Sequence, residues 1–117
     1  MTSPDKFKPA EPTTDVIARL FATIESRRGE DSSESYVAGL LQKGTPAIAC
    51  KVGEEAVETV VAALGNGRDD LIAESADLLF HLLVLWADAG IRPADVFQEL
   101  ARREGTSGIT EKQNRRE

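Results

Sequence analysis

Apolar residues recur along most of the chain with the period of an α-helix, about 3.6 residues, and no segment alternates with the period of a β-strand. Glycines, prolines and capping residues divide this pattern into five predicted helices. They are Asp15 to Arg28, a short helix from Ser33 or Ser35 to Gly44, a helix with Thr45 as N-cap and Pro46 behind it, a helix ending at Gly90, and a last helix from Arg92 and Pro93 to Gly105 with Val96, Phe97 and Leu100 facing inward. The sequence therefore predicts an all-α fold, a four- to five-helix bundle.

Two of the predicted helices are apolar almost all round and carry one narrow acidic strip each. In the first, an arc of about 100° holds the polar residues Lys51, Glu54, Glu55 and Glu58. In the second, a strip of about 60° holds Asp70, Glu74, Asp77, His81 and Asp88. Helices this apolar are normally buried, so we expect both to be covered and their acidic strips to face something other than bulk water.

The linker around Gly67 is short, and short connections make neighbouring helices antiparallel. Counting outward from Gly67, Glu58 lies nearly opposite Glu74, and Glu55 lies nearly opposite Asp77. Each pair is offset by about 3 Å along the helix axis, and packed helix axes are about 8–10 Å apart. The central antiparallel pair is therefore expected to bring four carboxylates to one point.

Four carboxylates at one point repel one another. Two such charges about 4 Å apart repel by about 4 kcal/mol at an effective dielectric of about 20, so a cation is expected among them. Oxygen ligands suit Mg²⁺, or Mn²⁺, rather than zinc. The alternative is a solvated helix face of charges that binds no metal.

Length and composition describe a small single domain. The 117 residues divide into an N-terminal arm (1–13), a helical domain (14–105) and a basic C-terminal tail (106–117). Two nearly all-apolar helices have more surface than so short a chain buries alone, which favours a homodimer. The tail has one apolar residue, Ile109, and its composition alone is typical of a disordered end.

Charge and composition exclude several classes of protein. The net charge of −6 argues against nucleic-acid binding, and the longest apolar run is too short to cross a membrane. The start of the chain lacks the apolar segment of a secretory signal, so a cytoplasmic protein is expected. The one cysteine, Cys50, precludes an internal disulfide and is expected to be a small core residue. The single histidine precludes a multi-histidine metal site within one chain.

The spacing of the carboxylates, Glu55-x-x-Glu58, fifteen residues, Glu74-x-x-Asp77, resembles the signature of the all-α nucleoside triphosphate pyrophosphohydrolases. Five segments in order look like the phosphoribosyl-ATP pyrophosphatase family of histidine biosynthesis: RLFATIESRRG, SYVAGLLQKG, KVGEEAVET, ESADLLFHLLVL and RREGTSGITEKQNRR. This resemblance runs from about residue 16 to residue 116. The serine-tyrosine segment and the SGITEK tail narrow it to this member of the superfamily.

The resemblance implies an oligomeric, Mg²⁺-dependent hydrolase of a small nucleotide. Its substrate is N1-(5-phosphoribosyl)-ATP, cleaved at the α–β anhydride to phosphoribosyl-AMP and pyrophosphate. The implied metal ligands are Glu55, Glu58, Glu74 and Asp77. Glu58 is also a catalytic candidate, together with Glu54, which either orients the attacking water, binds a second metal ion or is only a surface charge.

Three further polar residues are candidates for the site. Lys51 lies one turn before Glu55, where it forms either a helix salt bridge or, as in the family motif, a phosphate contact. Lys112 is a second candidate for phosphate binding if the tail folds across the site. His81, four residues after Asp77, is expected to hydrogen-bond a ligating carboxylate and hold it in place.

Two other functions fit the same residues. A house-cleaning pyrophosphohydrolase of ordinary (d)NTPs, from the same superfamily, would keep the carboxylates and differ in its substrate pocket. A non-enzymatic helical interaction module would use the acidic strips to bind a basic partner.

Overall fold

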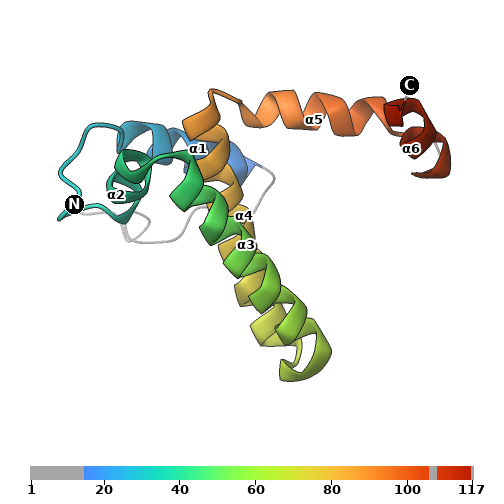
Figure 1. Ribbon diagram of the computed structural model, residues 1–117, viewed down its shortest axis with the longest axis horizontal. Helices are drawn as coiled ribbons and strands as arrows, with labels where there is room; N and C mark the ends of the chain where they lie inside the picture. Colours follow the sequence, from blue (N-terminus) through green and yellow to red (C-terminus); the bar gives the residue numbers. More distant parts are fainter. Residues whose placement is uncertain (1–14, 106–107, 117) are drawn as a thin grey trace, which may run out of the picture.

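The computed structural model describes residues 15–105 and 108–116 (Figure 1). In this part of the chain every regular element is a helix, and there is no β-strand. The helices, in order, are α1 (Asp15–Ser26), α2 (Tyr36–Lys43), α3 (Thr45–Val61), the π-helix η2 (Ala62–Asn66), α4 (Arg68–Ala89), α5 (Pro93–Arg102) and α6 (Gly108–Arg116). The prediction of an all-α fold is confirmed. The predicted N-terminal arm lies outside the described residues.

The helix boundaries follow the predicted punctuation closely. Ser35 is the N-cap of α2, and its hydroxyl accepts a hydrogen bond from the Ala38 backbone N–H at 3.1 Å. Gly90 ends α4 in the left-handed conformation, with φ of 73°, which a residue with a side chain adopts only at a cost. The N-cap predicted for α3 is wrong by one residue. Gly44 occupies it, and the Thr45 hydroxyl instead donates to the Asp88 carboxylate on α4.

Helices α3 and α4 form the long antiparallel pair that runs through the molecule (Figure 1). Two threonine hydroxyls of α3 define how the helices are aligned: Thr45 donates to Asp88, and Thr59 lies 3.2 Å from the Glu74 backbone carbonyl oxygen. The two contacts are fourteen residues apart on each helix, so the register is the same at both ends. It differs by one residue, about 1.5 Å along the axis, from the register predicted by counting from Gly67.

The hydrophobic core occupies one end of this pair, where α1 and α2 pack against it (Figure 1). Its buried members come from all four helices: Ile24, Leu40, Ile48, Leu83, Val84 and Ala87. Toward η2 the pair extends beyond α1 and α2. Side chains there stay exposed, including Val57, Val60, Val61 and Leu64 at 53 to 83%. Within one chain this end of the helix pair is therefore left uncovered, because α1 and α2 pack against its other end. The sequence predicts such a surplus, since it contains more apolar surface than so short a chain buries alone.

Two burial expectations are wrong. Cys50 is exposed and is not a core residue. Helix α5 leaves the body and has its main contact there with α1, so Phe97 and Leu100 are 47% and 55% exposed instead of facing a core (Figure 1). An open apolar pocket of about 420 Å³ separates α1 from the start of α5 and is lined in part by Phe21 and Phe97.

Helix α5 is supported mainly by contacts within itself. Arg92 caps its start, and the Arg92 backbone N–H donates to the Asp95 carboxylate at 2.9 Å. Near its end, the hydrogen bond from Arg102 lowers the pKa of Glu99 to about 2. Among the described residues, no helix is both long and apolar enough to cross a membrane.

The Ser35 cap generates a prediction about α2. Replacing Ser35 by alanine leaves the Ala38 N–H without its partner, and we expect it to lower the free energy of unfolding by about 1 kcal/mol. Urea denaturation measures this, with Ser32→Ala, at an exposed position in the preceding turn, as the control. Equal losses in the two variants would show that the cap contributes nothing particular to α2.

Candidate metal and phosphate site

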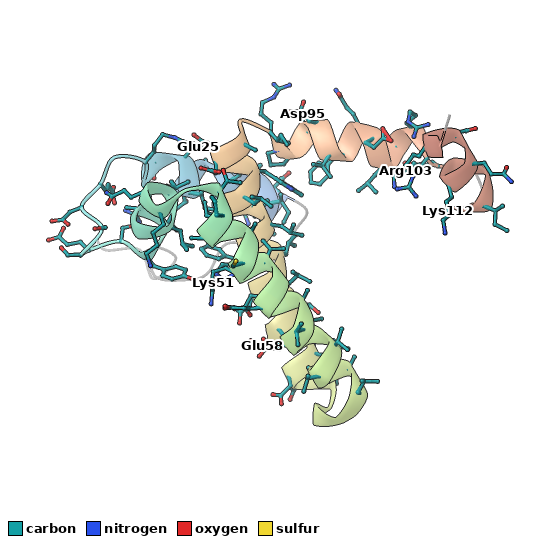
Figure 2. All side chains as sticks on the ribbon, in the orientation of Figure 1. Glu25, Lys51, Glu58, Asp95, Arg103 and Lys112 are labelled. Atoms are coloured by element: carbon teal, nitrogen blue, oxygen red, sulfur yellow. The ribbon has the colours of Figure 1, made fainter. Side chains whose placement is uncertain are left out.

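Three carboxylates meet between α3 and α4. Glu55 and Glu58 lie three residues apart on one face of α3, and the antiparallel register places Glu74 of α4 opposite them. One oxygen from each of the three lies within 4.8 Å of the other two. Glu55 is buried, Glu74 is half-buried and Glu58 is exposed, so the group opens to solvent on the Glu58 side. Figure 2 shows Glu58 at the edge of the helix pair.

Two oxygens in this group have no hydrogen-bond donor. Glu55 Oε2 and Glu74 Oε2 are both buried and unpartnered among the described residues. A buried carboxylate oxygen without a partner is costly and is rare in folded proteins. Hard divalent cations bind to carboxylate oxygens arranged in this way. The residues present therefore fit a Mg²⁺ or Mn²⁺ ion, as the sequence predicted.

Asp77 lies on the same strip of α4 but outside this group. Its side chain is exposed, and its carboxylate is not among the oxygens that come within 4.8 Å of one another. The structure thus brings together three of the four predicted ligands. That Asp77 is the fourth stays a prediction.

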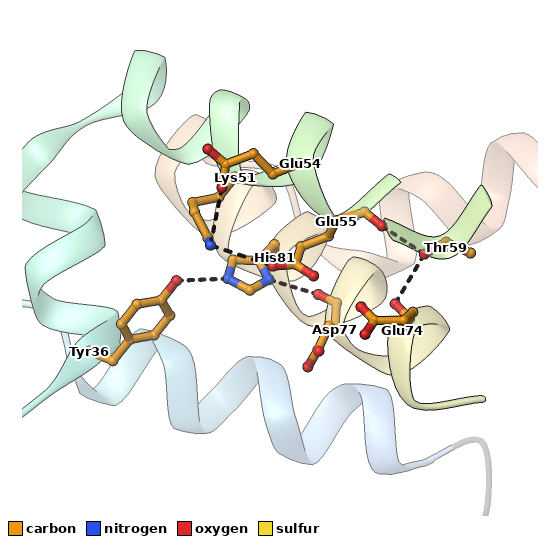
Figure 3. Close-up of polar contacts among 8 residues, drawn as sticks. All are labelled: Tyr36, Lys51, Glu54, Glu55, Thr59, Glu74, Asp77 and His81. Carbon is orange, nitrogen blue, oxygen red and sulfur yellow. Dashed lines mark hydrogen bonds and ion pairs between the residues drawn. The ribbon is translucent and has the colours of Figure 1, made fainter. Parts of the chain in front are cut away.

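Lys51 pairs with two carboxylates at once (Figure 3). Its Nζ lies 3.3 Å from Glu54 Oε2 and 3.4 Å from Glu55 Oε1. The hydrogen bond with Glu54, and next the nearby Tyr36 hydroxyl, raise the pKa of Lys51 above its ordinary value. The helix salt bridge is therefore present. It places a permanent cation beside the buried Glu55 and ties Glu54, which is 62% exposed, to that cation.

His81 makes a different contact from the one predicted. Its Nδ1 lies 2.7 Å from the backbone carbonyl oxygen of Asp77, and its Nε2 lies 2.9 Å from the Tyr36 hydroxyl (Figure 3). Neither nitrogen contacts a carboxylate in the described structure. The carbonyl four residues earlier lies directly beside a helical side chain, and it takes the ring N–H that a carboxylate was expected to take.

Sequence reasoning missed two residues of this site. Tyr36 was given no role in the site, but it is 56% exposed and its hydroxyl reaches His81 from α2. Thr59 lies one residue after Glu58, and its hydroxyl is shared by the backbone carbonyls of Glu55, at 2.7 Å, and Glu74, at 3.2 Å. The polar character of both side chains within otherwise apolar segments was the available signal.

Lys112 is not brought to the carboxylates within one chain. It lies on α6, beyond α5, while Lys51 and Glu58 lie on α3 (Figure 2). The figure shows the two regions at well-separated parts of the molecule. That Lys112 binds phosphate stays a prediction. In this arrangement of the helices, it requires Lys112 to act at a site other than the carboxylate group of its own chain.

The chain matches the family model described as phosphoribosyl-ATP pyrophosphohydrolase over residues 17–104, about three quarters of its length. The chain belongs to this family. The predicted resemblance is thereby confirmed, and the matched range includes every residue of the carboxylate group together with Tyr36, Lys51 and His81. Lys112 lies beyond the matched range.

Curated relatives support the same assignment to the phosphoribosyl-ATP pyrophosphohydrolase family. The chain is 59% identical over 100 residues to the phosphoribosyl-ATP pyrophosphatase of Paramagnetospirillum magneticum, covering 86% of this chain and 92% of that protein. It is 56% identical over 101 residues to the one of Azospirillum brasilense, covering 86% and 91%. The protein of the same name from Caulobacter vibrioides is 57% identical over 103 residues, covering 87% and 94%.

The unpartnered oxygens lead to a prediction about metal binding. Without a cation the three carboxylates repel one another, so we expect Mn²⁺ or Mg²⁺ to raise the melting temperature relative to EDTA. Glu74→Gln removes one charge, and should raise the melting temperature in EDTA while losing most of the rise caused by metal. Thermal unfolding monitored by circular dichroism measures both effects.

The control for that experiment is Glu34→Gln, at an exposed turn position far from the group in sequence. It removes the same charge and should leave the metal-induced rise unchanged. A metal-induced rise that is equal in Glu74→Gln and Glu34→Gln would contradict a metal site at these carboxylates.

Proposed function

We propose that this chain hydrolyses N1-(5-phosphoribosyl)-ATP at the α–β phosphoanhydride, giving phosphoribosyl-AMP and pyrophosphate in histidine biosynthesis. Membership of the family makes the chain a hydrolase of a nucleotide's phosphoric anhydride. In this structure, the proposal is supported by the group of Glu55, Glu58 and Glu74, which contains two buried oxygens without a hydrogen-bond partner. A protein that holds carboxylates in this way needs a cation there, and a polyphosphate substrate needs the same cation.

The residues supply positioned charge, which is most of what phosphoanhydride hydrolysis requires. A divalent cation held by Glu55, Glu58, Glu74 and Asp77 would neutralise phosphoryl oxygens and lower the pKa of a bound water. Lys51 is held beside Glu55, and its ammonium would bind the phosphates of the substrate. Water attacks the α-phosphorus, the bond to the bridging oxygen breaks, and pyrophosphate leaves.

Two carboxylates are candidates for the proton that the attacking water loses. Glu58 is the exposed member of the group and so the one that solvent reaches directly. Glu54 is also exposed. It is the sequence neighbour of Glu55 and forms an ion pair with Lys51. We propose that these two residues orient the attacking water, with Glu58 closest to the other carboxylates.

A house-cleaning (d)NTP pyrophosphohydrolase is the second candidate. The carboxylates and Lys51 would act in the same way on any nucleoside triphosphate, because their proposed roles are toward the metal and the phosphates, which all these substrates share. The family match favours phosphoribosyl-ATP. The helical interaction module has no comparable support, since the relatives are named as pyrophosphatases.

Pyrophosphate release distinguishes these functions. The wild type should release pyrophosphate from phosphoribosyl-ATP only when Mg²⁺ is present, and ATP and dNTPs should be poor substrates. Glu58→Gln should lower kcat by about a hundredfold or more, because a charged group that acts on the reacting phosphate is lost. Asp77→Asn should do the same if Asp77 completes the metal site.

The matched control is Glu104→Gln, at an exposed position beyond α5, which should keep full activity. Comparable turnover of dNTPs would replace the proposed substrate while keeping the site. Full activity of Glu58→Gln would contradict the site itself.

We also propose that the working form is a homodimer. Four large apolar residues are exposed together on α3 and η2: Val57, Val60, Val61 and Leu64. Such a group is larger than the single exposed apolar residues of an ordinary surface. A second copy of the chain would cover them. The cytoplasmic location expected from the sequence is part of the same proposal.

The dimer is tested by light scattering during size-exclusion chromatography. The wild type should elute with twice the mass of one chain. Val60→Glu with Leu64→Glu should elute as a monomer, because two charges would be buried in the interface. The control Gln98→Glu adds a negative charge at a polar, exposed position of α5 and should stay dimeric. A monomeric wild type would contradict the proposal.

A further inference from the structure

A hydrogen-bonded chain of three residues links α2 to the part of α4 that carries Asp77 (Figure 3). The Tyr36 hydroxyl lies 2.9 Å from His81 Nε2, and His81 Nδ1 lies 2.7 Å from the Asp77 carbonyl oxygen. The two rings meet edge to face, with centroids 5.8 Å apart and an interplanar angle of 83°. Tyr36 and His81 are 45 residues apart in sequence, so this is a tertiary contact.

The chemistry of these groups determines which atom donates at each step. A carbonyl oxygen only accepts, so the hydrogen between His81 and Asp77 belongs to His81 Nδ1. In the neutral imidazole the other nitrogen, Nε2, then has a lone pair and accepts from the Tyr36 O–H. The Asp77 carbonyl thus fixes the tautomer of His81, and the Tyr36 hydroxyl donates to the nitrogen that this tautomer leaves without a hydrogen.

The imidazole that receives this hydrogen bond is buried, with 6% of its surface exposed. Phe80 packs against a second side of the ring, edge to face at 5.2 Å. Without the Tyr36 hydroxyl, the Nε2 lone pair would lack the partner it has in the structure, and the ring would be held by its Nδ1–H bond alone. The position of the ring would then be less well defined.

The same hydroxyl lies beside the phosphate-binding candidate. Figure 3 shows the Tyr36 hydroxyl and the Lys51 ammonium on the same side of the His81 ring, and Lys51 in turn pairs with Glu55. A side chain of α2 thus hydrogen-bonds to α4 next to the cation that α3 carries (Figure 3).

We propose that Tyr36 is a positioning residue of the hydrolytic site, whose hydroxyl holds the buried His81 ring through Nε2 and thereby holds the Asp77 turn of α4 in place against α2. This inference rests on the proposed function for its catalytic consequence. Tyr36 acts through His81 and touches neither metal nor the cleaved bond. Displacement of a ligand-bearing turn by even about 1 Å is enough to slow catalysis strongly.

Tyr36→Phe tests the proposal, because it removes the hydroxyl and keeps the ring. His81 is the only histidine, so its ring nitrogens give one assignable pair of ¹⁵N resonances. With the imidazole neutral, the wild type should show a protonated Nδ1 and an unprotonated, hydrogen-bonded Nε2. In Tyr36→Phe the Nε2 resonance should shift to higher frequency, toward that of an imidazole nitrogen that accepts no hydrogen bond, while Nδ1 stays protonated by its bond to the Asp77 carbonyl.

The same variant should lower kcat on phosphoribosyl-ATP and weaken Mn²⁺ binding, measured by isothermal titration calorimetry, by about tenfold each. KM should change by less than about twofold, because the hydroxyl does not hold the substrate. His81→Gln should have a similar effect. In the double variant the two losses should not multiply, because both substitutions break one hydrogen-bonded unit.

Val37→Ala is the matched control on α2. It removes packing against the core and leaves the hydroxyl in place, so it should lower the melting temperature without changing the His81 resonances or Mn²⁺ affinity. Unchanged resonances in Tyr36→Phe, or multiplying losses in the double variant, would overturn the proposal. The resonances and the Mn²⁺ affinity need no turnover, so an inactive wild type would reject the proposed function and leave this test intact.

Discussion

The mutual repulsion of Glu55, Glu58 and Glu74 is the constraint on which the rest of the structure depends. These carboxylates come together because two long helices run antiparallel in one register, and the burial of Glu55 keeps away part of the water that would screen them. A chain without a ligand for this place would gain stability by losing any one of the charges. A bound cation would remove this repulsion, so the group has the electrostatic character of a cation-binding site.

The polar contacts around the carboxylates serve to keep the helices aligned. Thr59 shares its hydroxyl between carbonyls of the two ligand-bearing helices, and Lys51 offsets part of the negative charge from within α3. The Tyr36–His81 hydrogen bond attaches α2 to the same region. Each contact is modest by itself. Together they define the separation between groups that must meet one substrate, where small displacements matter most.

Much of the apolar surface of this chain has no partner within the chain. The exposed side chains near η2 and the outer face of α5 belong to helices that extend beyond α1 and α2. The family model matches residues 17–104, and the chain covers most of the length of its curated relatives. These helices therefore belong to the part of the chain that the family shares. The proposed homodimer would cover these side chains, in keeping with a core confined to one end of a small domain.

The sequence by itself determined helices α1 to α5, the antiparallel order of α3 and α4 and three of the carboxylates that meet, because helical periodicity, glycine punctuation and a short linker are local properties. It did not predict η2 or α6, whose segments lack an apolar stripe of that kind. It also carried the family, through motifs that need no folding to be compared. Only the tertiary structure decided what covers what. The exposure of Cys50, the separation of α5 from the core and the choice of the Asp77 carbonyl by His81 depend on which surfaces other helices reach. Tyr36 entered the site for the same reason, since a contact across 45 residues leaves no periodic trace in the sequence.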